Sequence, residues 1–318
     1  MAAYIGRRLI TALIVIIIVS LLVFLVIRIL PGDPVLIYLS RTEVSNLTPQ
    51  EIQAVRVKFG LDKPMAVQYV TWLGQVVRGN LGQSLYQQED VAKLMAQRLP
   101  ITLNLSVLSF LLSGIIGITF GLICALRRGK AIDSTLTTIA IFGITIPTFW
   151  LAIMLIYLFG LKWQVLPLYG YVSPFTDLGS NIKHIILPVF CMAIFPIASV
   201  TRQTRSSTLE VTRQDYIRTA WAKGLRERVI VVRHILKNGL IPVITLMGMS
   251  LSFILGGAVI IETVFSITGM GRLSVDAVFS NDYPIIQAII LITATMVVLV
   301  NLGVDLLYGW LDPRIRYS

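Results

Sequence analysis

The side chains that could do chemistry are few in this 318-residue sequence, and they are scattered. The cysteines Cys124 and Cys191 lie inside apolar runs, and neither has a partner at a spacing typical of a disulfide framework or a zinc site. His184 and His234 are far from each other in the chain, and no Ser-His-Asp arrangement or Gly-x-x-x-x-Gly-Lys-Ser/Thr phosphate loop occurs. The sequence therefore predicts no catalytic site, no bound cofactor and no metal site.

An excess of apolar residues accompanies this scarcity. The chain is 56% hydrophobic and 14% charged, whereas soluble domains are about 25% charged. The net charge of +11 would suggest nucleic acid in a soluble protein, but here the basic residues stand beside apolar runs, which is typical of membrane proteins. The runs are continuous rather than alternating, so they predict helices and not a β-barrel. We expect one all-α membrane unit over 1–318, in contact with lipid and without nucleic acid.

Six stretches without Asp, Glu, Lys or Arg are long enough to cross a hydrocarbon core of about 30 Å, which takes about 20 helical residues. Pro188 and Pro196 interrupt the fourth and shortest of these runs, so we expect a kink or tilt there. Glu262 and Asp305 stand at the ends of runs, where they are expected to anchor helix ends at the interface. The predicted spans are about 9–27, 99–126, 134–161, 184–201, 238–261 and 283–304.

The loops between these runs predict the orientation. One set of short loops and ends carries sixteen Lys and Arg, nine of them within 202–237, and the opposite set carries three. Because cytoplasmic loops are enriched in Lys and Arg, both termini are expected in the cytoplasm. Segment 31–98 is then external, and its patterning, with a helix expected over 49–59, predicts a small folded element.

The cytoplasmic loop 202–237 is too polar to enter lipid and is expected to hold a surface helix of about 11 residues. Thr212 and Asp215 have the spacing of a capping box, and Gly224 is suited to the left-handed position that ends a helix. The residues between them give one apolar stripe on an otherwise basic helix, and the stripe consists of Tyr216, Ile217, Ala220 and Trp221. Such a helix fits either a groove on a partner protein or a membrane surface, and the residues alone favour the two equally.

At this loop the sequence resembles a known family. Asp215–Gly224 followed by Arg233–Pro242 is similar to the EAA loop of ABC-importer permeases, in the variant of dipeptide, oligopeptide and nickel transporters. Further blocks of similarity follow in the family order, and they are Leu30–Pro34, Phe59–Pro64, Gly79–Ser84, Arg98–Leu103, Glu262–Phe265, Gly269–Leu273, Asp282–Gln287, Asp305–Gly309 and Asp312–Arg316.

The resemblance implies a permease subunit with a type I importer fold and no enzymatic activity of its own. Its expected partners are a second, similar permease, two cytoplasmic ATPases that hold ATP and Mg, and an extracytoplasmic substrate-binding protein, in a prokaryotic plasma membrane. The residues expected to couple to the ATPase are Asp215, Tyr216, Ile217, Arg218, Thr219, Ala220, Trp221, Lys223 and Gly224. Arg218, Thr219 and Ala220 occupy the EAA positions. Arg218 stands where other ABC importers have glutamate, which argues against a glutamate-based ion pair with the ATPase at that position.

The substrate is less constrained than the class. Di- and oligopeptides are the favoured substrates, and a nickel or other metal chelate, glutathione and an oligosaccharide are alternatives within the class. An ion-coupled secondary transporter is disfavoured because the runs hold no Asp, Glu or His at mid-depth, and a membrane scaffold is a third possibility. No substrate-binding residue is assigned, although the spans offer hydroxyl and amide groups at Thr145, Thr148, Ser252, Gln287 and Asn301. The backbone could bend at Pro147, Pro188, Pro196 and Gly256–Gly257.

Overall fold

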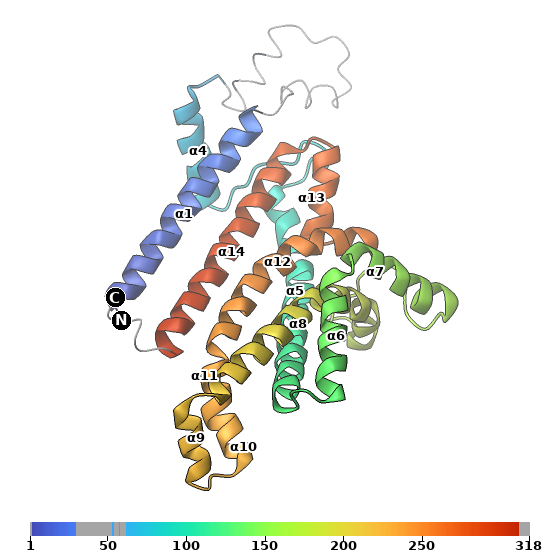
Figure 1. Cartoon of the computed structure of the whole chain (residues 1–318). Helices are drawn as coiled ribbons and strands as arrows, with labels where there is room; N and C mark the ends of the chain where they lie inside the picture. Colours follow the sequence, from blue (N-terminus) through green and yellow to red (C-terminus); the bar gives the residue numbers. More distant parts are fainter. Residues whose placement is uncertain (1, 30–52, 54–56, 58–61, 312–318) are drawn as a thin grey trace.

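The computed structural model describes residues 2–29, 53, 57 and 62–311, which are almost entirely helical (Figure 1). Five helices in this part of the chain are long and apolar enough to cross a membrane, or six if one bent pair counts as a single span. The all-helical, multi-span architecture expected from the sequence is therefore confirmed. The Leu30–Pro34 and Asp312–Arg316 blocks, and most of the helix expected over 49–59, lie outside the described residues.

Two long helices form the centre of the fold. They are α5 (Val91–Leu126) and α8 (Leu178–Thr212), and both extend beyond the apolar runs in the sequence. Glycines on α5 allow a close approach: a Cβ atom added at Gly121 would lie 2.5 Å from the Cβ atom of Thr204 on α8 and 2.6 Å from the Thr201 carbonyl oxygen. In membrane proteins such small residues take the place of a hydrophobic driving force between helices.

Gly121→Ala is therefore expected to destabilise the permease. The added methyl group would meet backbone as well as side-chain atoms of α8, so the two helices must separate, and such overpacking costs about 1–3 kcal/mol. The measurement is the thermal unfolding midpoint in detergent. The matched control is Gly303→Ala on another long helix, where an added Cβ atom has nothing within 4 Å. Equal midpoints for the two variants would contradict close packing of α5 on α8.

Helix α8 continues through Pro188 and Pro196, and a larger share of its apolar window is buried than in any other candidate span of the described chain. It packs against α5, α6 (Ala131–Thr145) and α12 (Ile241–Val264). The Ser109 hydroxyl of α5 donates a hydrogen bond to the Val189 carbonyl at 3.2 Å. A side chain of α5 thus bonds directly to the backbone of α8 and ties the two helices together.

The apolar run over 134–161 contains a break. Helix α6 ends at Thr145, and α7 (Thr148–Leu155) begins after Pro147, followed by a π-helix, η1 (Ile156–Lys162). The two halves are bent by 103°, and α7 projects sideways from the bundle (Figure 1). Proline restricts the preceding residue to extended backbone, and Ile146 has φ −72° and ψ 124°.

The first and last long helices lie side by side at the edge of the bundle (Figure 1). They are α1 (Ala2–Ile29) and α14 (Tyr283–Leu311), and an ion pair of 2.9 Å joins Arg8 to Asp305. The short helix α4 (Met65–Val77) packs on α1, with the hydroxyls of Tyr69 and Ser20 2.8 Å apart.

Two fully buried carboxylates flank the short helix α13 (Met270–Phe279), which lies at the end of the bundle opposite α9 (Asp215–Ala222; Figure 1). Asp282 follows α13 and accepts hydrogen bonds from Ser84 Oγ at 2.5 Å and from the backbone N–H of Tyr86 at 3.0 Å. Glu262 precedes it, near the end of α12. The side chain is 0% exposed and accepts hydrogen bonds from Thr102 and from the start of α13, so it is held by the protein itself.

Candidate functional site

The loop between α8 and α12 carries a short helix, α9 (Asp215–Ala222), at one tip of the molecule (Figure 1). It is shorter than the sequence suggests, and the expected capping box is wrong. Helix α8 continues to Thr212, whose hydroxyl donates to the Thr208 carbonyl at 2.7 Å, one turn back. Gln214 takes the N-cap position of α9 and makes no side-chain capping bond.

The carboxyl end of α9 is a Schellman motif. Gly224 has φ +71°, which confirms the left-handed conformation expected there. Its N–H donates to the Trp221 carbonyl at 2.9 Å, and the N–H of Leu225 donates to the Ala220 carbonyl at 3.4 Å. Lys223 is the C-cap residue and stands at the negative end of the helix dipole. The helix therefore has a fixed end and presents its faces in a defined orientation.

The apolar stripe expected on this helix divides into two halves. Ile217 and Ala220 are buried, and with Ile230, Val231 and Ile235 they form a small hydrophobic cluster that also contacts Leu122, Val211 and Leu236. Tyr216 and Trp221, by contrast, are 45% and 47% exposed. The sequence could not divide the stripe because all four residues share one side of the helix. The buried half fixes α9 to its own chain, and the aromatic half is open.

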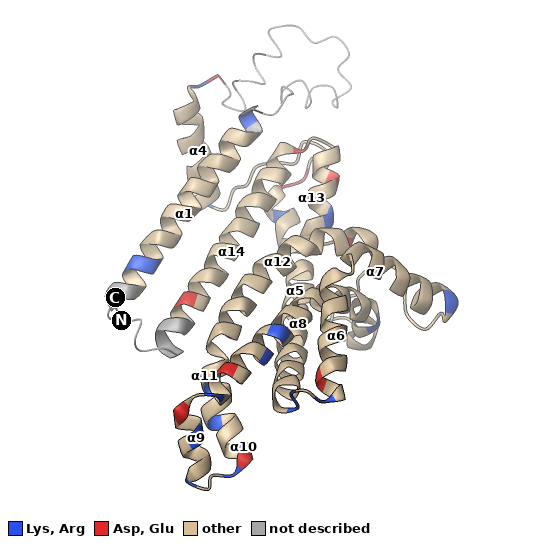
Figure 2. Ribbon diagram, viewed as in Figure 1, with Lys and Arg blue, Asp and Glu red and all other residues tan. Residues whose placement is uncertain are grey.

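The charged residues of α9 are exposed. An ion pair of 3.4 Å joins Arg218 to Asp215, whose side chains are 76% and 95% exposed, so it contributes little to stability. The Thr219 hydroxyl donates to the Asp215 carbonyl at 3.0 Å, within the same helix. Charged residues gather at this tip and in the turn between α5 and α6, whereas the long helices carry few and mainly towards their ends (Figure 2).

A polar link that the sequence did not indicate joins α9 to the next long helix. The Asn238 side-chain amide donates to the Tyr216 hydroxyl and to the His234 carbonyl, both at 3.0 Å. Asn238 lies in α11 (Lys237–Gly239), directly before α12. Asn238 belongs to the Arg233–Pro242 block of family similarity, so the residue itself stands out in the sequence. Its partner does not, because it is a side chain 22 residues away.

The chain from α9 to the centre of the fold is helical almost without interruption. α10 (Glu227–Val229) passes into the π-helix η2 (Ile230–Leu236), and then into α11 and α12. Pro242 stands in the first turn of α12 and has no N–H for the Asn238 carbonyl, so the helical hydrogen bonding is weakest at this junction. The Asn238–Tyr216 bond bridges α9 to that junction. This hydrogen bond and the helical chain between the two elements therefore connect α9 directly to the start of α12.

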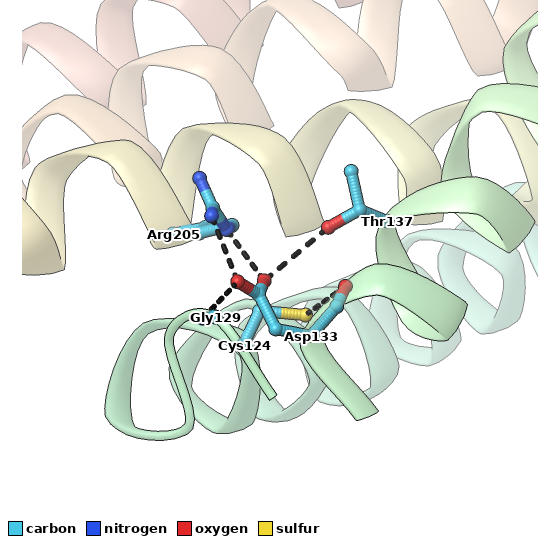
Figure 3. A network of polar contacts seen from close by, with 5 residues as sticks. All are labelled: Cys124, Gly129, Asp133, Thr137 and Arg205. Atoms are coloured by element: carbon cyan, nitrogen blue, oxygen red, sulfur yellow. Dashed lines mark hydrogen bonds and ion pairs between the residues drawn. The ribbon is translucent and has the colours of Figure 1, made fainter. Parts of the chain in front are cut away.

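A second polar cluster fixes α6 to α8 at the same end of the bundle (Figure 3). Arg205 on α8 makes two hydrogen bonds to Asp133, with Nε to Oδ1 at 2.8 Å and the second nitrogen to Oδ2 at 2.9 Å. The Gly129 N–H donates to Oδ2 at 3.0 Å, and the Thr137 hydroxyl lies 3.4 Å from Oδ1. The sequence does not indicate this cluster, although Asp133 stands out as an acidic residue beside a basic loop.

Asp133→Asn is expected to weaken the attachment of α6 to α8. The Asp133 side chain is 7% exposed, and hydrogen bonds to a charged group contribute about 1.5–3 kcal/mol, so a comparable loss in the free energy of unfolding should follow. Denaturation in detergent measures it. A double-mutant cycle with Arg205→Gln should show coupling between the two sites. Additive effects of the two substitutions would contradict the pairing.

Comparison with solved structures gives the class of protein that this fold defines. The chain is similar to a chain of the MetNI methionine ABC transporter, in a structure of its inward-facing conformations, with a TM-score of 0.56 over 69% of this chain and 96% of that one. The sequences are 15% identical, so the similarity concerns the fold alone. About two thirds of the chain thus has the fold of an ABC importer permease.

Sequence comparison then identifies the family. Residues 117–317 match the family of binding-protein-dependent transport system inner membrane components, and residues 1–106 match the N-terminal family of such components. The chain belongs to this family. A probable peptide ABC transporter permease protein of Sinorhizobium fredii is 40% identical over the whole of both chains. The di/tripeptide transport system permease protein DppB of Pseudomonas aeruginosa is 38% identical, again over the whole of both chains.

Proposed function

We propose that this chain is a permease subunit of an ATP-driven importer of di- and oligopeptides, and that α9 is the helix that docks to its ATPase. The observation that carries the proposal is the divided stripe of α9. Ile217 and Ala220 fix one half to the chain that leads into α12, while Tyr216 and Trp221 remain open at the tip. Exposed aromatic anchors on a short helix fit a groove on a partner protein.

Peptides are the proposed substrate because full-length relatives carry peptide or di/tripeptide transport in their names. The assembly would contain a second homologous permease, two ATPase subunits that hold ATP and Mg, and a substrate-binding protein outside the membrane. The sixteen Lys and Arg on one side support a cytoplasmic position for both termini and for α9, in a prokaryotic cell. This chain would then form part of the pathway without hydrolysing ATP itself.

The coupling follows from the geometry of the loop. When nucleotide closes the ATPase dimer, each docked α9 moves with its groove. The cluster of Ile217 with Ile230 and Ile235, together with the Tyr216–Asn238 hydrogen bond, transfers this movement to α12. Two packings of the same helices, separated by a few kcal/mol, are sufficient for nucleotide to select between inward-facing and outward-facing states.

Reconstitution tests the proposal. Proteoliposomes that contain this chain, the second permease and the ATPases should accumulate peptide when ATP and the loaded binding protein are supplied. ATP hydrolysis should rise with the loaded binding protein and not with the empty one. The proposal is overturned if the chain alone accumulates solute in sealed vesicles under an imposed pH or sodium gradient.

A further inference from the structure

A hollow of about 440 Å³ lies beside the break between α6 and α7. Its lining comes from the first residue of α7, the middle of α8 and the middle of α12, and it includes Thr148, Met192, Phe195, Ser252, Gly256 and Gly257. The volume is within the range of about 300–1,000 Å³ that is usual for small-molecule sites. The hollow lies away from α9, so it is not part of the proposed ATPase site.

Three of the bend positions expected from the sequence meet at this hollow. Thr148 follows Pro147 at the 103° break, and Phe195 directly precedes Pro196, with Met192 one helical turn before it. Gly256 and Gly257 lie opposite them on α12, and a Cβ atom added at either would have nothing within 4 Å. None of the three prolines is itself a lining residue. Positions at which the sequence allows the backbone to bend therefore lie around the hollow.

The break also leaves backbone groups without helical partners. The first hydrogen bond at the start of α7 is donated by Leu151 to the Pro147 carbonyl at 3.0 Å. The amides of Thr148, Phe149 and Trp150 precede it, and α7, which is wholly within the described chain, has no side-chain cap. At membrane depth such backbone is tolerated only when it is buried in protein or lines a water-filled cavity. Of these three residues, Thr148 lines the hollow.

The lining has a chemistry of its own. Thr148 and Ser252 supply hydroxyl groups, and the described residues that line the hollow include none that is charged. Phe195 and Phe253 stack with their ring centroids 4.6 Å apart and provide an apolar wall. A neutral ligand with amide donors and acceptors and apolar side groups matches this set. A free metal ion does not, because one thiol, Cys191, is the only strong metal ligand in the lining.

We propose that this hollow is a solute subsite of the translocation pathway and that it binds the amide backbone of the transported peptide. The inference rests on the proposed function. The backbone amide of Thr148 and the hydroxyls of Thr148 and Ser252 replace the water that the peptide loses, while the aromatic pair accommodates its side chains. Because the lining is uncharged, binding is weak enough for release, as transport requires.

Filling the hollow is the first test, in the complete importer reconstituted in proteoliposomes. Gly257→Val places a side chain into open space, so no atom of the chain itself opposes it. Peptide transport driven by the loaded binding protein should lose at least tenfold in kcat/KM, while the second permease and the ATPases still co-purify. The matched control is Gly303→Val on α14, which also has nothing within 4 Å and does not line the hollow. Its transport should equal that of the wild type.

Thiol labelling is the second test, and it identifies the occupant. Ser252→Cys is made together with Cys124→Ala and Cys191→Ala, in the same complete importer. A charged, water-soluble methanethiosulfonate reagent should modify the new thiol, and a tripeptide delivered by the binding protein should slow that reaction. Modification only by a lipid-soluble maleimide would show that lipid fills the hollow and would overturn the inference. If neither reagent modifies the thiol at position 252 even when no peptide is present, the partner permease covers the hollow. That result would also overturn the inference.

The two proposals fail in different ways. If the proposed function is wrong, neither the wild type nor Gly303→Val accumulates peptide with ATP. If only the subsite is wrong, both transport normally, and Gly257→Val transports as they do.

Discussion

Trp221→Glu is expected to leave the permease in the membrane at the wild-type level but without its ATPase subunits. The Trp221 side chain is 47% exposed, so its replacement removes little from the packing of this chain. In the docked state the indole would be an aromatic anchor, and anchors of this kind cost at least about 2 kcal/mol when they are truncated. A buried carboxylate adds a desolvation cost. Co-purification of ATPase with the tagged permease should fall at least thirtyfold, since about 1.4 kcal/mol is a factor of ten.

Two comparisons make this result specific. Phe175→Glu introduces the same charge at an aromatic side chain that is 97% exposed in the segment between η1 and α8, and it should retain the ATPase. Ile217→Glu places the charge in the buried half of the same helix and should lower the yield of folded permease, because Ile217 is 1% exposed. Wild-type recovery of ATPase with Trp221→Glu would contradict docking through the aromatic half of α9.

Much of the architecture follows from local properties of the sequence. An apolar run without charges must lie in lipid or in a protein core, so the long helices could be located without knowing their neighbours. Gly224 could be placed at a helix end because the left-handed backbone conformation that ends many helices favours glycine. The surface helix α9 could be predicted for the same reason, because its charged residues and its single apolar side are properties of the local sequence.

Features that depend on neighbours could not be predicted. Pro147 lies at a 103° break, whereas Pro188 and Pro196 lie within one continuous helix. The residue type is the same, and the difference is that α8 is held on several sides by packed helices. In the same way, the sequence could not divide the stripe on α9, because the burial of Ile217 depends on Ile230 and Ile235. It could not pair Asp133 with Arg205, 72 residues away.

Glu262→Ala is expected to destabilise the opposite end of the bundle by roughly 3–5 kcal/mol. Its Oε1 atom accepts from the Thr102 hydroxyl at 2.6 Å, and its Oε2 atom accepts from the Arg272 N–H at 3.0 Å. The Gly271 N–H also donates to this carboxylate, and the Thr102 hydroxyl accepts from the Met270 N–H at 2.8 Å. The side chain therefore caps α13 from a neighbouring helix and ties it to α5. Each buried donor left unsatisfied costs about 1–3 kcal/mol, and the lost volume adds to this.

The order of three variants tests that role. Glu262→Gln keeps the volume and one accepting oxygen but places an NH₂ group against a donor, so its unfolding midpoint in detergent should lie between those of the wild type and Glu262→Ala. Glu89→Ala is the control, because Glu89 is 47% exposed and pairs only with Lys93 at 3.4 Å, an interaction worth little. Gly269 packs closely against the carboxylate, since a Cβ atom added at Gly269 would lie only 2.4 Å from it. This close packing supports a fixed position for the carboxylate. If Glu262→Ala unfolds at the temperature of Glu89→Ala, the carboxylate does not hold α13 in place.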